Sequence, residues 1–274
     1  MALPDQPRGA IVVTGCGAAG RAAATATAAT TVTPGELPGA VKSGAVLLIA
    51  ATPGAHAEVT AVARGGRAAG ALTVVVTPPP ETEGERQSLA RVRKVADAAV
   101  VAPPPRGVTD AAGTLAVGVD AIVALVSETG LVNVDLADLD TVLAGTGAAA
   151  LCRGREPSGE TAVASALEPL DGLDATTGVL VHVAGGEAMS VATAGEAIEA
   201  VGDRVPPEAH LIWGAAIDEA LAGELRVRLV VAGVTPGGAD ACPRCGAGME
   251  TYELGTSATR ACEGCGYAGV GVRR

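Results

Sequence analysis

Short apolar segments that end in glycine or proline alternate with stretches of helix-forming residues through the first hundred residues. This alternation restricts the fold more than any other feature, because neighbouring strands joined through a helix run parallel. The sequence therefore predicts a parallel α/β sheet. The expected strands are 10–13, 46–51, 71–76 and 99–102. One helix is expected to begin at 21, and two more are expected at 56–64 and 83–97.

The pattern changes after a long apolar helix, which we predict at 114–129. The segments that follow read as a second, α+β unit. Its expected strands are 148–153, 179–184, 209–217 and 225–234, and its expected helices are 160–167 and 192–201. A link at 235–240 rich in glycine and proline leads to the last part of the chain.

Two Cys-x-x-Cys-Gly sequences lie near the end of the chain, with strand-like segments at 249–254 and 258–261 between them. Two-residue spacing lets both thiolates of a pair reach one tetrahedral ion, and the following glycine permits the required turn. Two disulfides or a redox-active pair are the alternatives, and a reducing cytoplasm disfavours both. We therefore predict a zinc ribbon in which one structural Zn²⁺ is bound by Cys242, Cys245, Cys262 and Cys265.

The chain is acidic, with a net charge of −11, and it contains two lysines and no phenylalanine. Carboxylates suit a salt-rich cytoplasm, where screening weakens their repulsion. A GC-rich genome would explain the alanine and arginine but not the acidity, so we expect a halophile. Acidity also argues against a nucleic-acid partner. With no apolar run of membrane-spanning length and no signal-peptide core, we expect a cytoplasmic protein.

Gly15, Gly17 and Gly20 follow the first predicted strand and open a helix. Glycines in this pattern let a backbone approach a phosphate, and a helix N-terminus favours negative charge. No acidic residue follows on a second strand at the distance expected for an NAD site, which disfavours NAD. Cys16, in the same turn, is either a reactive thiol at a helix N-terminus or a small packed residue.

Several segments resemble the FtsZ/tubulin superfamily, nearly without gaps from Thr114 to Val234. They are 130–143, 178–183, 210–219 and 226–234, and upstream 70–78, 83–86 and 93–97. The resemblance implies a shortened Rossmann-like tubulin/FtsZ N-terminal domain at 1–113 and a central helix at 114–130. An α+β FtsZ C-terminal domain at 131–235 and the small zinc ribbon at 240–274 would follow.

In this family GTP sits on one subunit, and a loop of the next subunit inserts acidic residues that complete hydrolysis. Asn133, Asp135 and Asp138 match that loop. Carboxylates there can orient an attacking water beside a phosphate. Asp135 is also well placed to cap a helix at 136–143, and both roles are compatible.

The nucleotide side departs from the family pattern. The glycine-rich signature expected after the strand 46–51 is replaced by Thr52–Ala55, in which Pro53 lacks an N–H to donate. Between Arg21 and Val46 the family's second strand, its helix and the γ-phosphate loops have no counterpart. Pro103–Pro105 replaces the turn that contacts the base, and the guanine-binding Asp of the central helix is missing, although Asp110 is nearby.

These departures leave Gly15, Gly17 and Gly20 as the only residual GTP or GDP contacts, and we lean towards a protein that is not an enzyme. The main hypothesis is a pseudo-GTPase that docks on, caps or co-assembles with FtsZ-type filaments. An active, self-assembling GTPase with a reduced pocket is the first alternative. A zinc-ribbon adaptor that uses the FtsZ-like body as a scaffold is the second, and in each case the partner is a protein.

Overall fold

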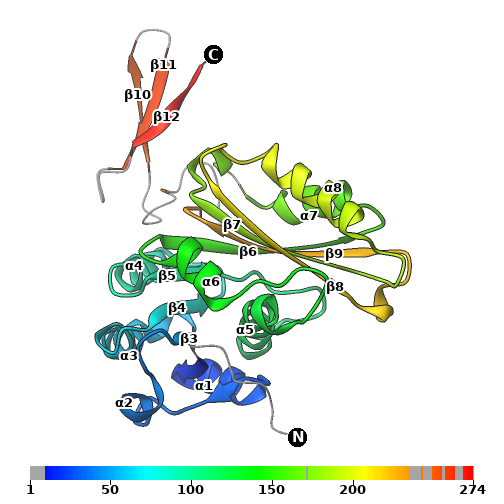
Figure 1. Cartoon of the computed structure of the whole chain (residues 1–274). Coiled ribbons are helices and arrows are strands. Elements are labelled where there is room, and N and C mark those ends of the chain that lie inside the picture. Colours follow the sequence, from blue (N-terminus) through cyan, green and yellow to red (C-terminus); the bar gives the residue numbers. More distant parts are fainter. Residues whose placement is uncertain are drawn as a thin grey trace, which may run out of the picture.

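The computed structural model describes residues 10–170, 172–234, 242, 249–254, 257–262 and 268–273. The body is built on one nine-stranded sheet, with the order β2-β1-β3-β4-β5-β6-β9-β7-β8 (Figure 1). Its strands are β1 (Ile11–Cys16), β2 (Thr30–Thr31), β3 (Val46–Ala51), β4 (Leu72–Thr77), β5 (Ala98–Val101), β6 (Gly147–Glu156), β7 (Gly178–Gly185), β8 (His210–Ile217) and β9 (Leu225–Ala232).

The helices of the body follow the predicted alternation. They are α1 (Gly17–Ala26), α2 (Leu37–Ala40), α3 (His56–Ala68), α4 (Glu83–Val92), α5 (Ala111–Ser127), α6 (Leu136–Leu143), α7 (Gly159–Leu167) and α8 (Val191–Gly202), with short 3₁₀ turns η1 (Pro53–Ala55), η2 (Leu173–Ala175) and η3 (Glu219–Leu221). No helix among the described residues is both long and apolar enough to cross a membrane.

The parallel pairing of β1, β3, β4 and β5 confirms the predicted α/β sheet. The segment between Arg21 and Val46 was predicted to lack a second strand and helix. The structure instead places there β2, which pairs with β1, and the single-turn helix α2. Elements of two and four residues are too short to produce a hydrophobic period, which is why the sequence did not reveal them.

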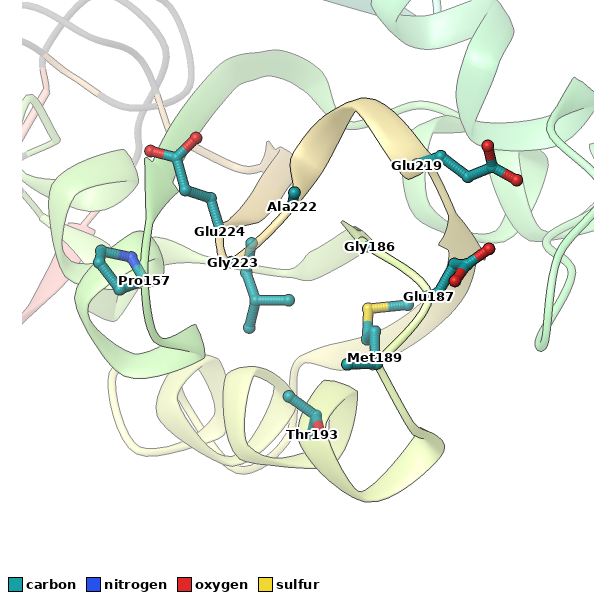
Figure 2. Close-up of a pocket in the computed structure, with 11 residues that line it drawn as sticks. Pro157, Gly186, Glu187, Met189, Thr193, Glu219, Ala222, Gly223 and Glu224 are labelled. Atoms are coloured by element: carbon teal, nitrogen blue, oxygen red, sulfur yellow. The ribbon is translucent and has the colours of Figure 1, made fainter.

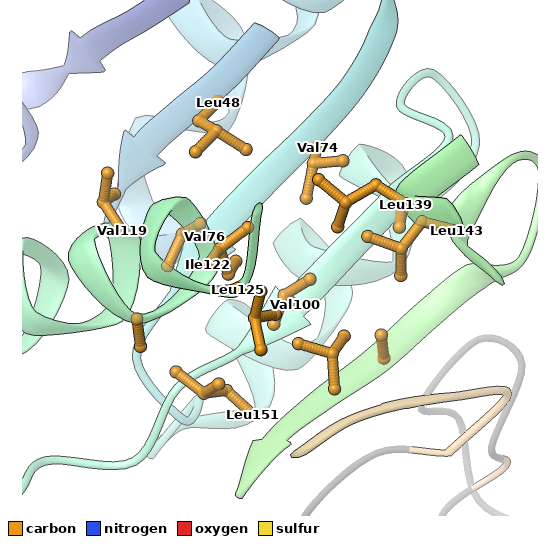
Figure 3. Packing of buried hydrophobic residues seen from close by; sticks show 14 of the residues in the cluster. Leu48, Val74, Val76, Val100, Val119, Ile122, Leu125, Leu139, Leu143 and Leu151 are labelled. Carbon is orange, nitrogen blue, oxygen red and sulfur yellow. The ribbon is translucent and has the colours of Figure 1, made fainter. Parts of the chain in front are cut away.

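Three buried clusters show how the helices cover the sheet. One face of the parallel strands packs against α1, α5 and α6, and the other packs against α2, α3 and α4. Figure 3 shows the first cluster, in which Ile122 and Leu125 of the long helix α5 meet Val76 and Val100 of the strands. The third cluster lies between β6–β9 and the pair α7 and α8.

The two halves of the body share the sheet, because β6 pairs in parallel with β5 at Ala98–Val101. Beyond this point β5 ends, and β6 continues with β9 as its antiparallel partner. Arg153 bridges the halves by donating a hydrogen bond to the carbonyl of Pro103. The mixed order of strands in the second half confirms the predicted α+β arrangement.

A separate three-stranded antiparallel sheet of β10 (Glu250–Leu254), β11 (Ser257–Ala261) and β12 (Ala268–Arg273) projects from the body in Figure 1. The first two strands were predicted as part of the ribbon, whereas β12 was not. Its sequence is largely alanine, glycine and valine, which gives little strand-specific signal.

Candidate functional site

The turn between β1 and α1 carries the three glycines of the predicted phosphate-binding pattern. A Cβ atom on Gly15 would collide with the carbonyl of Gly20, and one on Gly20 would collide with the carbonyl of Ala50 on β3. Gly17 has φ = 70°, a conformation that side chains rarely adopt. Each glycine therefore has a packing or backbone reason to be there that needs no ligand.

The N-terminus of α1 already holds a carboxylate of the same chain. The backbone N–H of Gly17 donates a hydrogen bond of 2.8 Å to Oε2 of Glu58, and Arg21 pairs with Oε1 at 2.9 Å. Glu58 itself lies in the first turn of α3. A negative group in this position is favoured by the partial positive charge of a helix N-terminus, which is where a phosphate would bind.

Cys16 lies in the same turn and is fully buried. Burial, with an added contribution from the Glu58 carboxylate, raises the pKa of its thiol to about 12. A thiol with this pKa is protonated at neutral pH, and only the thiolate is nucleophilic. Of the two interpretations of Cys16, the structure supports the small packed residue.

The turn after β3 packs onto the glycine turn. Its residues Pro53–Ala55 form η1, and a Cβ atom on Gly17 would lie 3.2 Å from Cβ of Ala55. Pro53 is buried and contributes no N–H. The N–H of Gly17, at the start of α1, is a donor that an anion could use, and Glu58 occupies it.

The predicted catalytic residues Asn133, Asp135 and Asp138 form the loop that enters α6. Asp135 accepts hydrogen bonds from the N–H groups of Ala137 (2.8 Å) and Asp138 (3.0 Å). Asp138 in turn accepts one from the N–H of Asp135 at 2.8 Å, which completes a capping box. Asn133 accepts from the N–H of Gly130 at 2.9 Å. The capping role foreseen for Asp135 is thus present.

The glycine turn and this acidic loop do not meet within one molecule. The turn joins β1 to α1, whereas Val132 of the loop pairs with Ala215 on β8. In the order of the sheet β1 and β8 are seven strands apart, and adjacent strands are spaced by about 4.8 Å. A site that used both groups would need two molecules.

A cavity of about 500 Å³ lies at one end of the second half, between the turn after β7 and the turn before β9 (Figure 2). Its charged side chains are Glu187, Glu219 and Glu224, and Met189 supplies an apolar wall. A cavity with only carboxylates as charged groups repels phosphate. This end of the molecule is therefore no substitute for a nucleotide site.

Two of the four predicted zinc ligands lie in the described residues. Cys242 and Cys262 are both buried and belong to one cluster, against which Met249 packs. Cys262 directly follows β11, whose last residue Ala261 pairs with Glu250 of β10. Cys245 and Cys265 lie outside the described residues. Cysteine thiolates are common zinc ligands, and Cys242 and Cys262 lie in one cluster, so both residues fit a thiolate zinc site.

The sequence of the chain is similar to that of FtsZ proteins. Residues 140–235 match the family model described as FtsZ family, C-terminal domain. A cell division protein FtsZ of Haloferax mediterranei is 37% identical over 199 residues, which is 63% of this chain and 52% of that protein. Cell division protein FtsZ 1 of Halobacterium salinarum is 38% identical over 199 residues, which is 63% of this chain and 50% of that protein. The chain thus spans about half the length of the curated relatives it matches.

Solved structures extend the similarity over most of the chain. An empty FtsZ dimer of M. jannaschii aligns with a TM-score of 0.70 at 26% identity, covering 83% of this chain and 89% of that one. TubZ of Bacillus thuringiensis serovar israelensis, in GDP-form protofilaments, aligns with a TM-score of 0.56 at 13% identity, covering 81% of this chain and 85% of that one. The second similarity concerns the fold alone.

Proposed function

Since the chain belongs to the FtsZ/tubulin superfamily, we propose that it is a cell-division cytoskeletal protein that docks on FtsZ-type filaments without using GTP. The observation that carries this proposal is the hydrogen bond from the Gly17 N–H to Glu58. The chain supplies its own anion to the turn in which a phosphate would bind.

The loop on the other side of the molecule supports the docking part of the proposal. Asn133 and Asp135 are exposed, and the same loop presents Leu131 with 47% of its surface accessible. A loop that exposes both an apolar side chain and the carboxylate of Asp135 suits contact with a protein better than contact with nucleic acid. We assign to this loop the contact with a filament subunit.

GTP is expected not to bind the turn of the purified chain, because a phosphate would have to displace Glu58 from Gly17 and Arg21. The check is calorimetric titration of GTP and, separately, of ATP in the same buffer. Micromolar binding that prefers guanine, with hydrolysis, would instead establish the active GTPase. The variant Glu58→Ala serves as a control, since it frees the Gly17 N–H and is expected to allow at most weak phosphate binding.

Co-sedimentation with FtsZ-type filaments from the same cell is expected, and Leu131→Asp is expected to reduce it at least tenfold. The reason is that a charge at the centre of a protein contact must be desolvated. Val191→Asp is the matched control, because Val191 is similarly exposed (51%) but lies at the start of α8. Equal loss in both variants, or no co-sedimentation of the unchanged chain, would contradict the proposal.

We also propose that Cys242, Cys245, Cys262 and Cys265 bind one structural Zn²⁺, which would stabilise the sheet β10–β12. If docking is lost when residues 240–274 are removed and the body stays folded, the ribbon rather than Leu131 is the contact, as the adaptor hypothesis requires.

The cytoplasmic location and the salt-rich environment of the protein stay predictions from the composition of the sequence.

A further inference from the structure

A cavity of about 580 Å³ lies along the free edge of β6, between the loop after β5 and the end of α7. It exists because β6 pairs with β5 only as far as Ala150, which lies opposite Val101. The chain then leaves the sheet as Pro103–Pro105, and prolines have no N–H groups with which to extend the pairing. A cavity of this size accommodates a small organic ligand.

The wall of this cavity is a ladder of arginines. In the antiparallel pairing of β6 with β9, Arg153 lies opposite Arg228, and Arg155 lies opposite Arg226. Residues directly opposite one another point to the same face, and like charges in such pairs are destabilising. Arg106 lines the cavity from the loop after β5. Five cationic side chains thus gather in a chain whose net charge is −11.

Carboxylates neutralise three of the five arginines. Arg155 pairs with Glu224 at 2.6 Å, Arg226 pairs with Asp218 at 2.9 Å, and Arg228 pairs with Glu128 at 2.9 Å. The neighbouring His182 adds no charge at neutral pH, because burial lowers its pKa to about 4 even though Glu128 raises it. The neutral ring of His182 therefore leaves the positive charge of the arginine ladder unchanged.

Arg153 is the member of the ladder without a carboxylate. Its Nη2 donates to the carbonyl of Pro103, and its buried Nη1 has no hydrogen-bond partner among the described residues. Burial lowers the pKa of this guanidinium, which shows that its charge is held at a cost. Arg106, which is exposed, likewise has no ion pair in the described part of the chain.

We propose that this cavity binds a small molecule that carries a polyphosphate, with Arg153 as its principal contact. A guanidinium group can donate two parallel hydrogen bonds to the oxygens of one phosphate. The two opposed arginine pairs are about 7 Å apart along the strands, a distance that a di- or triphosphate spans. The site is distinct from the β1–α1 turn, so it stands whether or not that turn holds a nucleotide. Because β6 and the loop after β5 belong to different halves of the body, an occupied cavity would link the two halves.

Titration of the full chain with sodium tripolyphosphate is expected to give saturable binding at one site per chain. Arg153→Met is expected to weaken that binding at least tenfold, because it removes the uncompensated charge. Arg64→Met is the matched control, since Arg64 is exposed on α3 away from the cavity, and it is expected to leave the affinity within a factor of two. All titrations share one salt concentration, since screening alone weakens such binding.

Circular dichroism of each variant establishes that it is folded, and Arg155→Met replaces Arg153→Met if the latter is not. Absence of saturable binding by the unchanged chain would overturn the proposal. So would an equal loss in the Arg64 and Arg153 variants, which would mean unspecific attraction to surface charge. Glu58→Ala is expected to leave tripolyphosphate affinity unchanged, which separates this cavity from the β1–α1 turn.

Discussion

Replacement of Gly20 by alanine is expected to lower the free energy of unfolding by about 3 kcal/mol or more, the upper range for an overpacked core. Helix α1 lies so close to β3 that a Cβ atom at this position would collide with the carbonyl oxygen of Ala50. Ala50 is fully buried within a strand that pairs on both sides, so its backbone has no room to retreat. Urea denaturation measures the change.

Gly65→Ala is the control for this prediction. Gly65 lies inside α3 and has open space where a Cβ atom would be, so alanine there is expected to stabilise the protein by roughly 0.5–1 kcal/mol. The two substitutions add the same methyl group with opposite expected signs. If Gly20→Ala is as stable as the unchanged chain, packing does not explain this glycine. That result would favour phosphate binding as the reason for a glycine in the turn.

Local patterns were sufficient to predict most of the secondary structure. The strand at Val46–Ala51 was predicted to the residue, because an uninterrupted buried run between turn residues has clear ends. The helix Leu136–Leu143 was also predicted to the residue, since Asp135 marks its start. Helix α4 was predicted five residues too long, because its polar residues continue past Val92 without a breaker.

The contacts that carry the functional proposals depend on tertiary structure. Glu58 was not singled out from the sequence, since it lies 41 residues from Gly17. The two residues meet only because β1 and β3, which precede α1 and α3, are adjacent in the sheet. The arginine ladder had a visible signal in the two Arg-x-Arg sequences, Arg153–Arg155 and Arg226–Arg228. To predict the ladder from these sequences, one also needs the register of β6 against β9, which the sequence does not specify.

The C-terminal segment is expected to lose its fold when a zinc ligand is removed. Cys242→Ser and Cys262→Ser are each expected to reduce bound zinc from one ion per chain to a small fraction, measured by native mass spectrometry. Zinc binding in such small modules contributes about 10–16 kcal/mol, which a three-stranded sheet of 5, 5 and 6 residues cannot replace by burial. Limited proteolysis should then cut within 242–273 while the body stays intact.

Cys152→Ser is the matched control, because Cys152 is buried in the body among β6, α7 and α8 and is expected to leave the zinc content unchanged. The disulfide alternative makes a different prediction: a chain mass lower by the hydrogens lost, and no bound metal. Full zinc content in Cys242→Ser would rule out Cys242 as a ligand. The described core of the sheet β10–β12 consists of Cys242, Cys262 and Met249, so we expect the fold of this sheet to depend on bound zinc.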